Sequence, residues 1–265
     1  MKVVMYGALG RMGRRIITLA SPDTDIEITG AVDTDPSMKG VDIGDVIGIG
    51  KLGVAISNDL ETEIKNADVV IDFSLPHATL VSSEICEKHG IALVVGTTGF
   101  SDIEKEQFLA NVKNVPCVFA PNMSVGVNLL FKLVRETAAI IGEDYDVEIT
   151  EIHHKFKKDA PSGTAKHIAE IIADTVNTPL EEYGVYGRQG ITGERTQKEI
   201  GIHAIRAGDV VGEHTVTFGT MGERFELVHK LHSRDALASG AIRAAKFAAT
   251  AQAGLYDMQD VLGLN

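Results

Sequence analysis

The densest cluster of chemically versatile side chains lies in one short segment, residues 151–165. It reads EIHHKFKKDAPSGTA and holds two histidines and three lysines directly before a predicted helix. Imidazole exchanges protons near neutral pH, and fixed ammonium groups stabilise developing negative charge. The composition of this segment therefore predicts acid–base chemistry on an anionic substrate.

The end of the segment has the features of a helix N-terminus. Asp159 or Ser162 is a suitable cap, and apolar residues recur at helical spacing over 164–176. Free backbone amides at such a terminus bind anions, and Gly163 lets a ligand approach closely. We expect the amides of Ser162, Gly163 and Thr164 to hold a carboxylate or a phosphate.

Two alternative interpretations use the same segment. Adjacent histidines on a strand point to opposite sides, so His153 and His154 are poorly placed to chelate one ion, and we expect no metal. One imidazole would face the site, and the other would contact a ligand from the rim. The plainer alternative is a solvated basic loop before a helix.

A glycine-rich turn near the N-terminus is a second candidate site. Gly7, Gly10 and Gly13 follow a strand-like run and open a helical one. The first glycine suits a tight turn, the second lets the backbone approach a pyrophosphate, and the third permits close helix packing. Asp33 ends the next predicted strand, where a carboxylate accepts hydrogen bonds from ribose hydroxyls. The pattern predicts a dinucleotide site, with plain turn glycines as the alternative.

The residues around Asp33 favour NADH over NADPH. The charge of this carboxylate disfavours a 2′-phosphate, and the next residue, Thr34, offers no cation. Lys39, Arg11 and Arg14 remain alternative partners for a phosphate. We therefore expect a modest preference for binding NADH.

Two later loops are candidates for the nicotinamide half of the cofactor. Residues 96–99 read GTTG and residues 120–124 read APNMS, and each loop follows a predicted strand. Thr97 and Thr98 would supply hydroxyl groups, and the second loop would supply backbone groups. Residues 72–74 would border the same crevice. Because Gly, Thr, Pro and Asn are ordinary turn residues, simple turns are the structural alternative.

The elements that would position these residues alternate between strand and helix in the first half of the chain. Buried strands are predicted at 2–6, 26–33, 67–73, 91–95 and 116–120, and helices at 11–20, 78–88 and 102–112. Such alternation predicts a Rossmann-like, doubly wound α/β domain with a parallel sheet covered on both faces.

The pattern changes after about residue 122. Helices are predicted at 128–141 and 164–176, strands at 146–153, 200–206, 213–218 and 224–229, and a polar loop at 178–199. Strands grouped in this way predict a C-terminal α+β domain with an open mixed sheet. The alanine-rich stretch 236–254 predicts a helix that returns to the first domain. We expect a dinucleotide-binding domain over 1–124 with 236–265, and a substrate domain over 125–235.

Composition narrows the functional class. A net charge of −12 argues against nucleic-acid binding, and it means that an anionic substrate needs a local positive cluster such as 151–165. The 265-residue chain has no signal-peptide pattern and no apolar run of about 18 residues, so we expect a soluble cytoplasmic protein away from membranes. Cys86 and Cys117 lie outside any CxxC motif and are expected to be core thiols.

Taken in order, the motifs of the chain resemble those of the dihydrodipicolinate reductase family, the 4-hydroxy-tetrahydrodipicolinate reductases of the diaminopimelate route to lysine. Segment 151–165 carries the strongest resemblance. The other matching motifs are GxxGRMG at 7–13, GTTGF at 96–100, APNMSVGVN at 120–128, RAGDVVGEH at 206–214, GER at 222–224 and HKLHSR at 229–234. The resemblance implies an oxidoreductase that transfers hydride from NAD(P)H to a small dicarboxylate.

The resemblance also implies a role for individual residues. His153 would be the general acid, and Lys157 the proton-donating or charge-stabilising lysine. The substrate-binding positions would be His154, Ser162, Gly163 and Thr164. The cofactor-binding positions would be Gly7, Ala8, Leu9, Gly10, Arg11, Met12, Asp33, Gly96, Thr97, Thr98, Ala120, Pro121, Asn122 and Met123. Members of this family are usually homotetramers built through the sheet of the second domain, which implies an oligomerisation role for 125–235.

Other functions share part of this pattern. An amino-acid dehydrogenase, or an oxidoreductase acting on aspartate-derived semialdehydes, would use a similar first domain but leaves DAPSGT at 159–164 unexplained. A nicotinamide-sensing regulator would need no catalytic histidine. Such a regulator normally carries a module with a basic binding face, which the sequence lacks.

Overall fold

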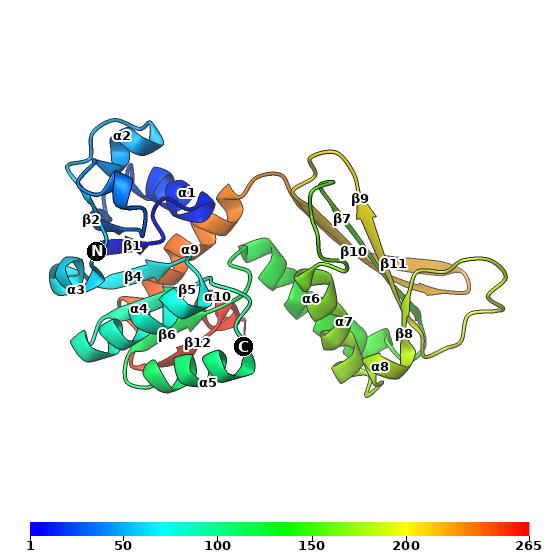
Figure 1. Cartoon of the computed structure of the whole chain (residues 1–265). Coiled ribbons are helices and arrows are strands. Elements are labelled where there is room, and N and C mark those ends of the chain that lie inside the picture. The colour runs from blue at the N-terminus through cyan, green and yellow to red at the C-terminus, as the bar shows by residue number, and fades with distance from the viewer. Residues whose placement is uncertain (265) are drawn as a thin grey trace. The chain divides into compact units, whose positions relative to one another are not determined.

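The computed structural model describes residues 1–264, which form two compact units (Figure 1). We call residues 1–125, together with those from Arg234 onward, unit 1, and residues 126–233 unit 2. Each unit has its own sheet and its own hydrophobic core. Within the described residues, no helix is both long and apolar enough to cross a membrane.

The centre of unit 1 is a seven-stranded sheet in which every neighbouring pair of strands runs parallel. In spatial order its strands are β12 (Gly254–Tyr256), β6 (Pro116–Phe119), β5 (Ala92–Val95), β4 (Val69–Asp72), β1 (Lys2–Tyr6), β2 (Glu27–Val32) and β3 (Ile56–Ser57). The strand order reverses between β1 and β4, which places a ligand crevice at the carboxyl ends of these strands. This topology confirms the predicted Rossmann-like fold.

Helices cover both faces of this sheet. α1 (Arg11–Ala20), α9 (Asp235–Ala248) and α10 (Met258–Leu262) pack on one face, and α3 (Leu60–Glu63), α4 (Pro76–His89) and α5 (Asp102–Asn111) pack on the other. The short elements are η1 (Pro36–Met38), α2 (Ile43–Ile47) and η2 (Ile64–Asn66). Val3 and Met5 enter one core and Val4 the other. Because both faces are buried, the central strands are continuous apolar runs, which made them predictable.

Two strands of unit 1 were not predicted from the sequence. β3 has two residues and β12 has three, which is too short for an alternating pattern, and both depend on pairing with strands distant in sequence. The predicted helix 236–254 ends at Ala248, and the chain then continues into β12. Cys86 and Cys117 are buried free thiols, as predicted.

Unit 2 contains the predicted open mixed sheet. Its strands, in spatial order, are β11 (Glu223–Leu231), β10 (Gly212–Thr220), β7 (Asp146–His153), β9 (Ile200–Arg206) and β8 (Gly184–Tyr186). β10 is antiparallel to both neighbours, while β7, β9 and β8 run parallel. The helices are α6 (Val125–Ile141), α7 (Gly163–Thr175) and α8 (Leu180–Tyr183). Val147 and Ile149 of β7 pack with α6 and α7 in the core, and β8 and α8 fall within the stretch predicted as loop.

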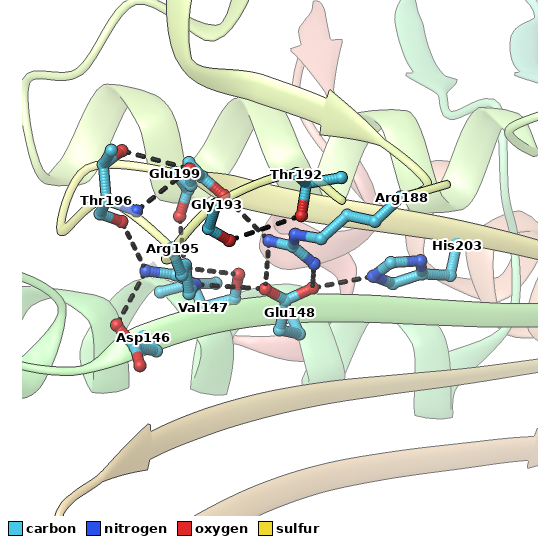
Figure 2. Close-up of polar contacts among 10 residues, drawn as sticks. All are labelled: Asp146, Val147, Glu148, Arg188, Thr192, Gly193, Arg195, Thr196, Glu199 and His203. Atoms are coloured by element: carbon cyan, nitrogen blue, oxygen red, sulfur yellow. Dashed lines mark hydrogen bonds and ion pairs between the residues drawn. The ribbon is translucent and has the colours of Figure 1, made fainter. Parts of the chain in front are cut away.

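On the other face of this sheet, an ion-pair cluster around Glu148 holds the loop 187–199 (Figure 2). Arg188 donates to both carboxylate oxygens at 2.8 and 3.0 Å, Arg195 donates to Oε1 at 3.1 Å, and His203 Nε2 lies 2.7 Å from Oε2. Burial raises the pKa of Glu148, but these donors outweigh burial and lower it to about 2. The loop is therefore anchored by charge to the middle strand of its own sheet.

Candidate functional site

Close backbone contacts shape the glycine-rich turn between β1 and α1. Gly7 has a φ of 80°, and a Cβ there would lie 2.7 Å from the Phe73 carbonyl oxygen. A Cβ on Gly13 would lie 2.2 Å from the carbonyl oxygen of Gly7. Gly10 precedes α1 and has no side chain to cap the first amides of the helix. This turn fits the phosphates of a dinucleotide, which need close backbone approach and an uncapped helix start.

Asp33 fixes this turn against the end of β2. Its Oδ2 accepts a hydrogen bond from the Leu9 amide, and its Oδ1 accepts one from the Thr34 amide, both at 2.8 Å. A cleft of about 520 Å³ opens beside it, and its lining includes Gly7, Leu9, Gly10, Arg14, Asp33, Thr34, Asn58, Phe73, Ser74 and His77. Three predicted residues of the turn lie outside this lining: Ala8, Arg11 and Met12. Asp33 therefore combines a structural contact with a place in the cleft wall.

A fully buried carboxylate, Asp72, ties together the loops that follow β4 and β5. Its Oδ1 accepts hydrogen bonds from the amide and hydroxyl of Ser74, and its Oδ2 accepts one from the Ser82 hydroxyl of α4. The Thr97 hydroxyl lies 3.4 Å from Oδ1. Burial raises the pKa of Asp72, although the hydroxyl donors oppose this shift. Thr97 thus faces the interior, and Thr98 is the exposed threonine of the pair.

The loop after β6 is positioned by α9. A Cβ on Gly240 of this helix would lie 1.7 Å from the Met123 carbonyl oxygen, so glycine is required for the close approach. Met123 and Ala120 are buried. Pro121 is exposed and Asn122 is half-buried. The predicted residues 120–123 therefore form a supported loop at the carboxyl end of β6.

Unit 2 holds a second polar cluster, centred on Glu151 of β7, which we call the Glu151 cluster. The carboxylate is fully buried. Arg206 of β9 donates to both oxygens at 2.8 and 2.9 Å, and the Ser162 amide donates to Oε1 at 3.0 Å. His153 Nδ1 lies 2.6 Å from Oε2. Burial raises the pKa of Glu151, but the donors, Arg206 first, outweigh burial and lower it, so the group is ionised at neutral pH.

His153 follows Glu151 by two positions on the same face of β7. An ionised carboxylate can only accept, so Nδ1 donates to Glu151 and Nε2 is left for a ligand. The ring packs edge-on against His214, with centroids 5.3 Å apart. Desolvation lowers the pKa of His153 from 6.5, while Glu151 opposes this shift. Burial is therefore the main reason that this pKa lies below the ordinary imidazole value.

Helix α7 begins inside the Glu151 cluster. Ser162, rather than Asp159, is its N-cap: the hydroxyl accepts a hydrogen bond from the amide three residues later, and it lies 3.1 Å from His214 Nε2. Burial lowers the pKa of His214 to about 4, so its ring is neutral at neutral pH. Gly163 and Thr164 form the first turn. A Cβ on Gly163 would meet no described atom within 4 Å, so the space beside this turn is open.

Lys157 and His154 lie in the same segment. The Lys157 ammonium is 2.8 and 2.9 Å from the two carboxylate oxygens of Asp159, whose pKa it lowers. Arg206 also donates to the Asp159 carbonyl oxygen at 2.6 Å, which ties this turn to Glu151. His154 is half-buried, and its Nδ1 has no hydrogen-bond partner among the described residues. The structure thus joins His153, Lys157 and Ser162 through one hydrogen-bonded network.

Sequence reasoning missed three members of this cluster, namely Glu151, Arg206 and His214. Glu151 has a readable signal, because residues two apart on a strand share a face and the predicted strand ends in Glu-Ile-His. Arg206 lies 55 positions further along the chain, and His214 is paired opposite Glu151 on β10. Only the order β10-β7-β9 brings these side chains together, and that order cannot be read from local patterns.

Two family models match the chain. The model described as "Dihydrodipicolinate reductase, N-terminus" matches residues 1–123, and the one described as "Dihydrodipicolinate reductase, C-terminus" matches residues 126–262. The chain belongs to the dihydrodipicolinate reductase family. In this family, a 4-hydroxy-tetrahydrodipicolinate reductase of Syntrophus aciditrophicus (strain SB) is 51% identical over 264 residues, which cover 99% of this chain and 98% of that protein. One of Hahella chejuensis (strain KCTC 2396) is 50% identical, and 99% of both chains is covered.

Solved structures agree with this assignment. The dipicolinate-bound dihydrodipicolinate reductase from Paenisporosarcina sp. TG-14 matches with a TM-score of 0.77 and 26% identity, and 98% of each chain is covered. The amine dehydrogenase from Mycobacterium smegmatis has a TM-score of 0.59 at 14% identity and shares the fold alone. As a member of the dihydrodipicolinate reductase family, the chain is an oxidoreductase with a Rossmann-like unit for a pyridine nucleotide.

Proposed function

We propose that the chain reduces 4-hydroxy-tetrahydrodipicolinate to tetrahydrodipicolinate in the diaminopimelate route to lysine. The Glu151 cluster carries this proposal, because one buried carboxylate holds an acid, His153, beside the open N-terminus of α7. The relative from Paenisporosarcina binds a ligand of the same dicarboxylate class. The overall reaction adds one hydride and one proton to the ring and releases one water, so atoms and charge balance.

Unit 1 would bind the cofactor through the glycine-rich turn, Asp33 and the loops after β5 and β6. A reduced nicotinamide bound there supplies the hydride. Asp33 would accept hydrogen bonds from the ribose hydroxyls, and its charge opposes a 2′-phosphate, which favours NADH. Of the three cations considered for NADPH, Arg14 lines the cleft, whereas Arg11 and Lys39 do not.

Unit 2 would bind the substrate and supply the proton. The protonated ring of His153 donates from Nε2 as electron density accumulates on the substrate. Lys157 and the first-turn amides of α7 stabilise the negative charge. The remaining proposed carboxylate contacts are His154, Ser162, Gly163 and Thr164. A substrate carboxylate would take the place of Asp159 on the Lys157 ammonium.

We also propose that the protein is a cytoplasmic homotetramer assembled through the sheet of unit 2. The face of this sheet opposite α6 and α7 exposes apolar side chains, including Ile205 (43% exposed) and Val228 (51% exposed). Apolar residues on an open sheet face favour burial against another copy. Light scattering on the purified protein should give four times the mass of the chain; a monomer at assay concentration would contradict the assembly.

Turnover of the natural substrate tests the proposed reaction directly. The substrate is made in place from pyruvate and aspartate semialdehyde by dihydrodipicolinate synthase, and oxidation of NADH or NADPH is followed by absorbance. We expect oxidation of the cofactor only when pyruvate, aspartate semialdehyde and the synthase are all present together with the enzyme. Oxidation with an amino acid or a semialdehyde alone, and none with the synthase product, would exclude the proposed reaction.

Replacing Asp33 by asparagine should weaken NADH binding about tenfold, because a charged acceptor for the ribose hydroxyls is lost. The same change should narrow the gap between NADH and NADPH, since the negative charge that opposes the 2′-phosphate is removed. Calorimetric titration of both cofactors measures the two effects. Asp68→Asn is the matched control, because Asp68 also accepts from a backbone amide, that of Lys2, away from the cleft lining. Unchanged NADH affinity in Asp33→Asn would refute the ribose contact.

Adding a methyl group at Gly163 should raise the KM for substrate about tenfold without lowering the melting temperature. The added Cβ would meet no described protein atom within 4 Å, so its cost arises only when a ligand approaches the first turn of α7. Gly13→Ala provides the contrast, because its Cβ would collide with the Gly7 carbonyl and should destabilise the fold by about 1–3 kcal/mol. Thermal unfolding and steady-state kinetics separate the two. Wild-type KM in Gly163→Ala would remove Gly163 from the substrate site.

A further inference from the structure

We propose that Glu151, clamped by Arg206, is a positioning residue that selects the tautomer of His153 and aims its Nε2 at the substrate. This inference rests on the proposed function, because it concerns the acid of that reaction. Glu151 is 0% exposed, and its carboxylate is hydrogen-bonded to His153, Ser162 and Arg206, all within the protein. It therefore acts through His153 and does not contact the substrate.

The geometry leaves the Glu151 carboxylate little freedom. The two oxygens each accept one hydrogen bond from the Arg206 guanidinium, whose planar fork fixes the plane of the carboxylate. The second donor to Oε1 is the amide of the N-cap of α7, Ser162, and the second donor to Oε2 is His153 Nδ1. Two strands and a helix start thus fix the direction along which the imidazole must donate. With Nδ1 engaged in this way, the proton that the ring gives up comes from Nε2.

Charge in the Glu151 cluster also supports the inference. The charged or titratable groups that face His153 are Glu151 on its own strand, Lys157 in the following turn, Arg206 on β9 and His214 on β10. Of these four, Glu151 alone is negative. Desolvation lowers the pKa of His153, Lys157 and Arg206 lower it further, and Glu151 raises it. Glu151 is therefore the group that keeps the protonated acid populated.

The same strand provides a matched control on the opposite face of the sheet. Glu148 is also held by a two-pronged arginine, Arg188, and by a histidine, His203 (Figure 2). Residues 148 and 151 are three apart on β7, so their side chains point to opposite faces. Glu148→Gln therefore removes a comparable ion-pair network from the same strand without touching His153.

The test compares Glu151→Gln with Glu148→Gln in the full chain. Histidine-selective ¹⁵N NMR follows the tautomer and titration of His153, assigned with a His153→Asn sample, and needs no substrate. We expect the His153 pKa in Glu151→Gln to fall by about one pH unit and its single tautomer to become a mixture. The midpoint of the pH profile of kcat/KM should shift to lower pH by the same amount, which lowers kcat/KM about tenfold near neutral pH. Glu148→Gln should leave the His153 signals and the midpoint of the pH profile unchanged.

A second variant keeps the test decisive if Glu151→Gln does not fold. Arg206→Met removes a positive charge that lowers the His153 pKa, so the His153 titration and the midpoint of the pH profile of kcat/KM should both move to higher pH. Opposite shifts in the two variants would not arise from a merely structural role. An unchanged His153 titration in whichever of the two folds, or an equal shift in Glu148→Gln, overturns the inference. Absence of turnover by the wild type would instead count against the proposed function and leave the NMR result standing.

Discussion

His153→Ala should lower kcat by about 10² or more while leaving NADH affinity nearly unchanged, because the variant loses the proposed acid but keeps the proposed nucleotide cleft. The residue meets the geometric demands on an acid: its Nδ1 is engaged by Glu151, its Nε2 is left for a ligand, and the open first turn of α7 belongs to the same cluster. Steady-state kinetics with the synthase product and calorimetric titration of NADH measure the two quantities separately.

The sign of the pH dependence follows from the lowered pKa of His153. The protonated imidazole predominates only below that pKa, so wild-type kcat/KM should rise as the pH falls from about 8 to about 6, and His153→Ala should lose this rise. His203→Ala is the matched control, because His203 pairs with Glu148 at a similar distance on the opposite face of the sheet. Turnover at the wild-type rate in His153→Ala, or an equal loss in His203→Ala, would sink the assignment.

The parts of the fold that the sequence predicts are those with local physical signatures. The strands β1, β4 and β5 are buried on both faces, so each contains an unbroken apolar run. β3 and β12 are too short for any period to show, and they exist because a neighbouring strand offers its edge. β8 likewise joins the second sheet by pairing with β9, within a stretch whose composition indicates a loop.

The candidate site likewise has residues with a local sequence signal and residues without one. Residue type and spacing single out segment 151–165, because imidazole, ammonium and N-cap chemistry occur together there, and the family resemblance then selects His153 and Lys157 within it. The two groups that hold this segment in shape are less visible. Glu151 is detectable only through strand parity, and Arg206 only through the strand order of the folded sheet. Local sequence therefore locates the segment with the proposed reacting groups, while the side chains that hold it in place come together only in the folded sheet.

The pKa shifts and ion-pair partners of individual side chains are the properties that the sequence predicts least well. The same residue type, glutamate on β7, is clamped by arginine and histidine at both Glu148 and Glu151, yet the first anchors a loop and the second contacts the proposed acid, His153. Burial lowers the pKa of His214 to about 4, and burial of His153 lowers the pKa of that ring as well. These effects depend on distances of a few ångströms between segments far apart in the chain.

Lys157→Ala should reduce kcat by about 10² and raise the KM for substrate about tenfold, because one ammonium both binds a carboxylate and stabilises charge that develops on the ring. The side chain is only 19% exposed, and its charge is held at a defined point by Asp159, 2.8 and 2.9 Å away. A preplaced cation of this kind loses little conformational freedom when a substrate carboxylate replaces its protein partner.

The neighbouring Lys158 makes the prediction for Lys157 specific. It carries the same charge one position further along but is exposed, so Lys158→Ala changes the net charge of the segment equally without altering the Glu151 cluster. If Lys157 acted only through long-range attraction of an anionic substrate, both variants would weaken substrate binding alike, and the loss would shrink with added salt. We expect instead a loss confined to Lys157→Ala that persists at high salt. A variant defective only in NADH affinity would contradict the role assigned to Lys157, because the structure places this residue in the Glu151 cluster and outside the lining of the nucleotide cleft.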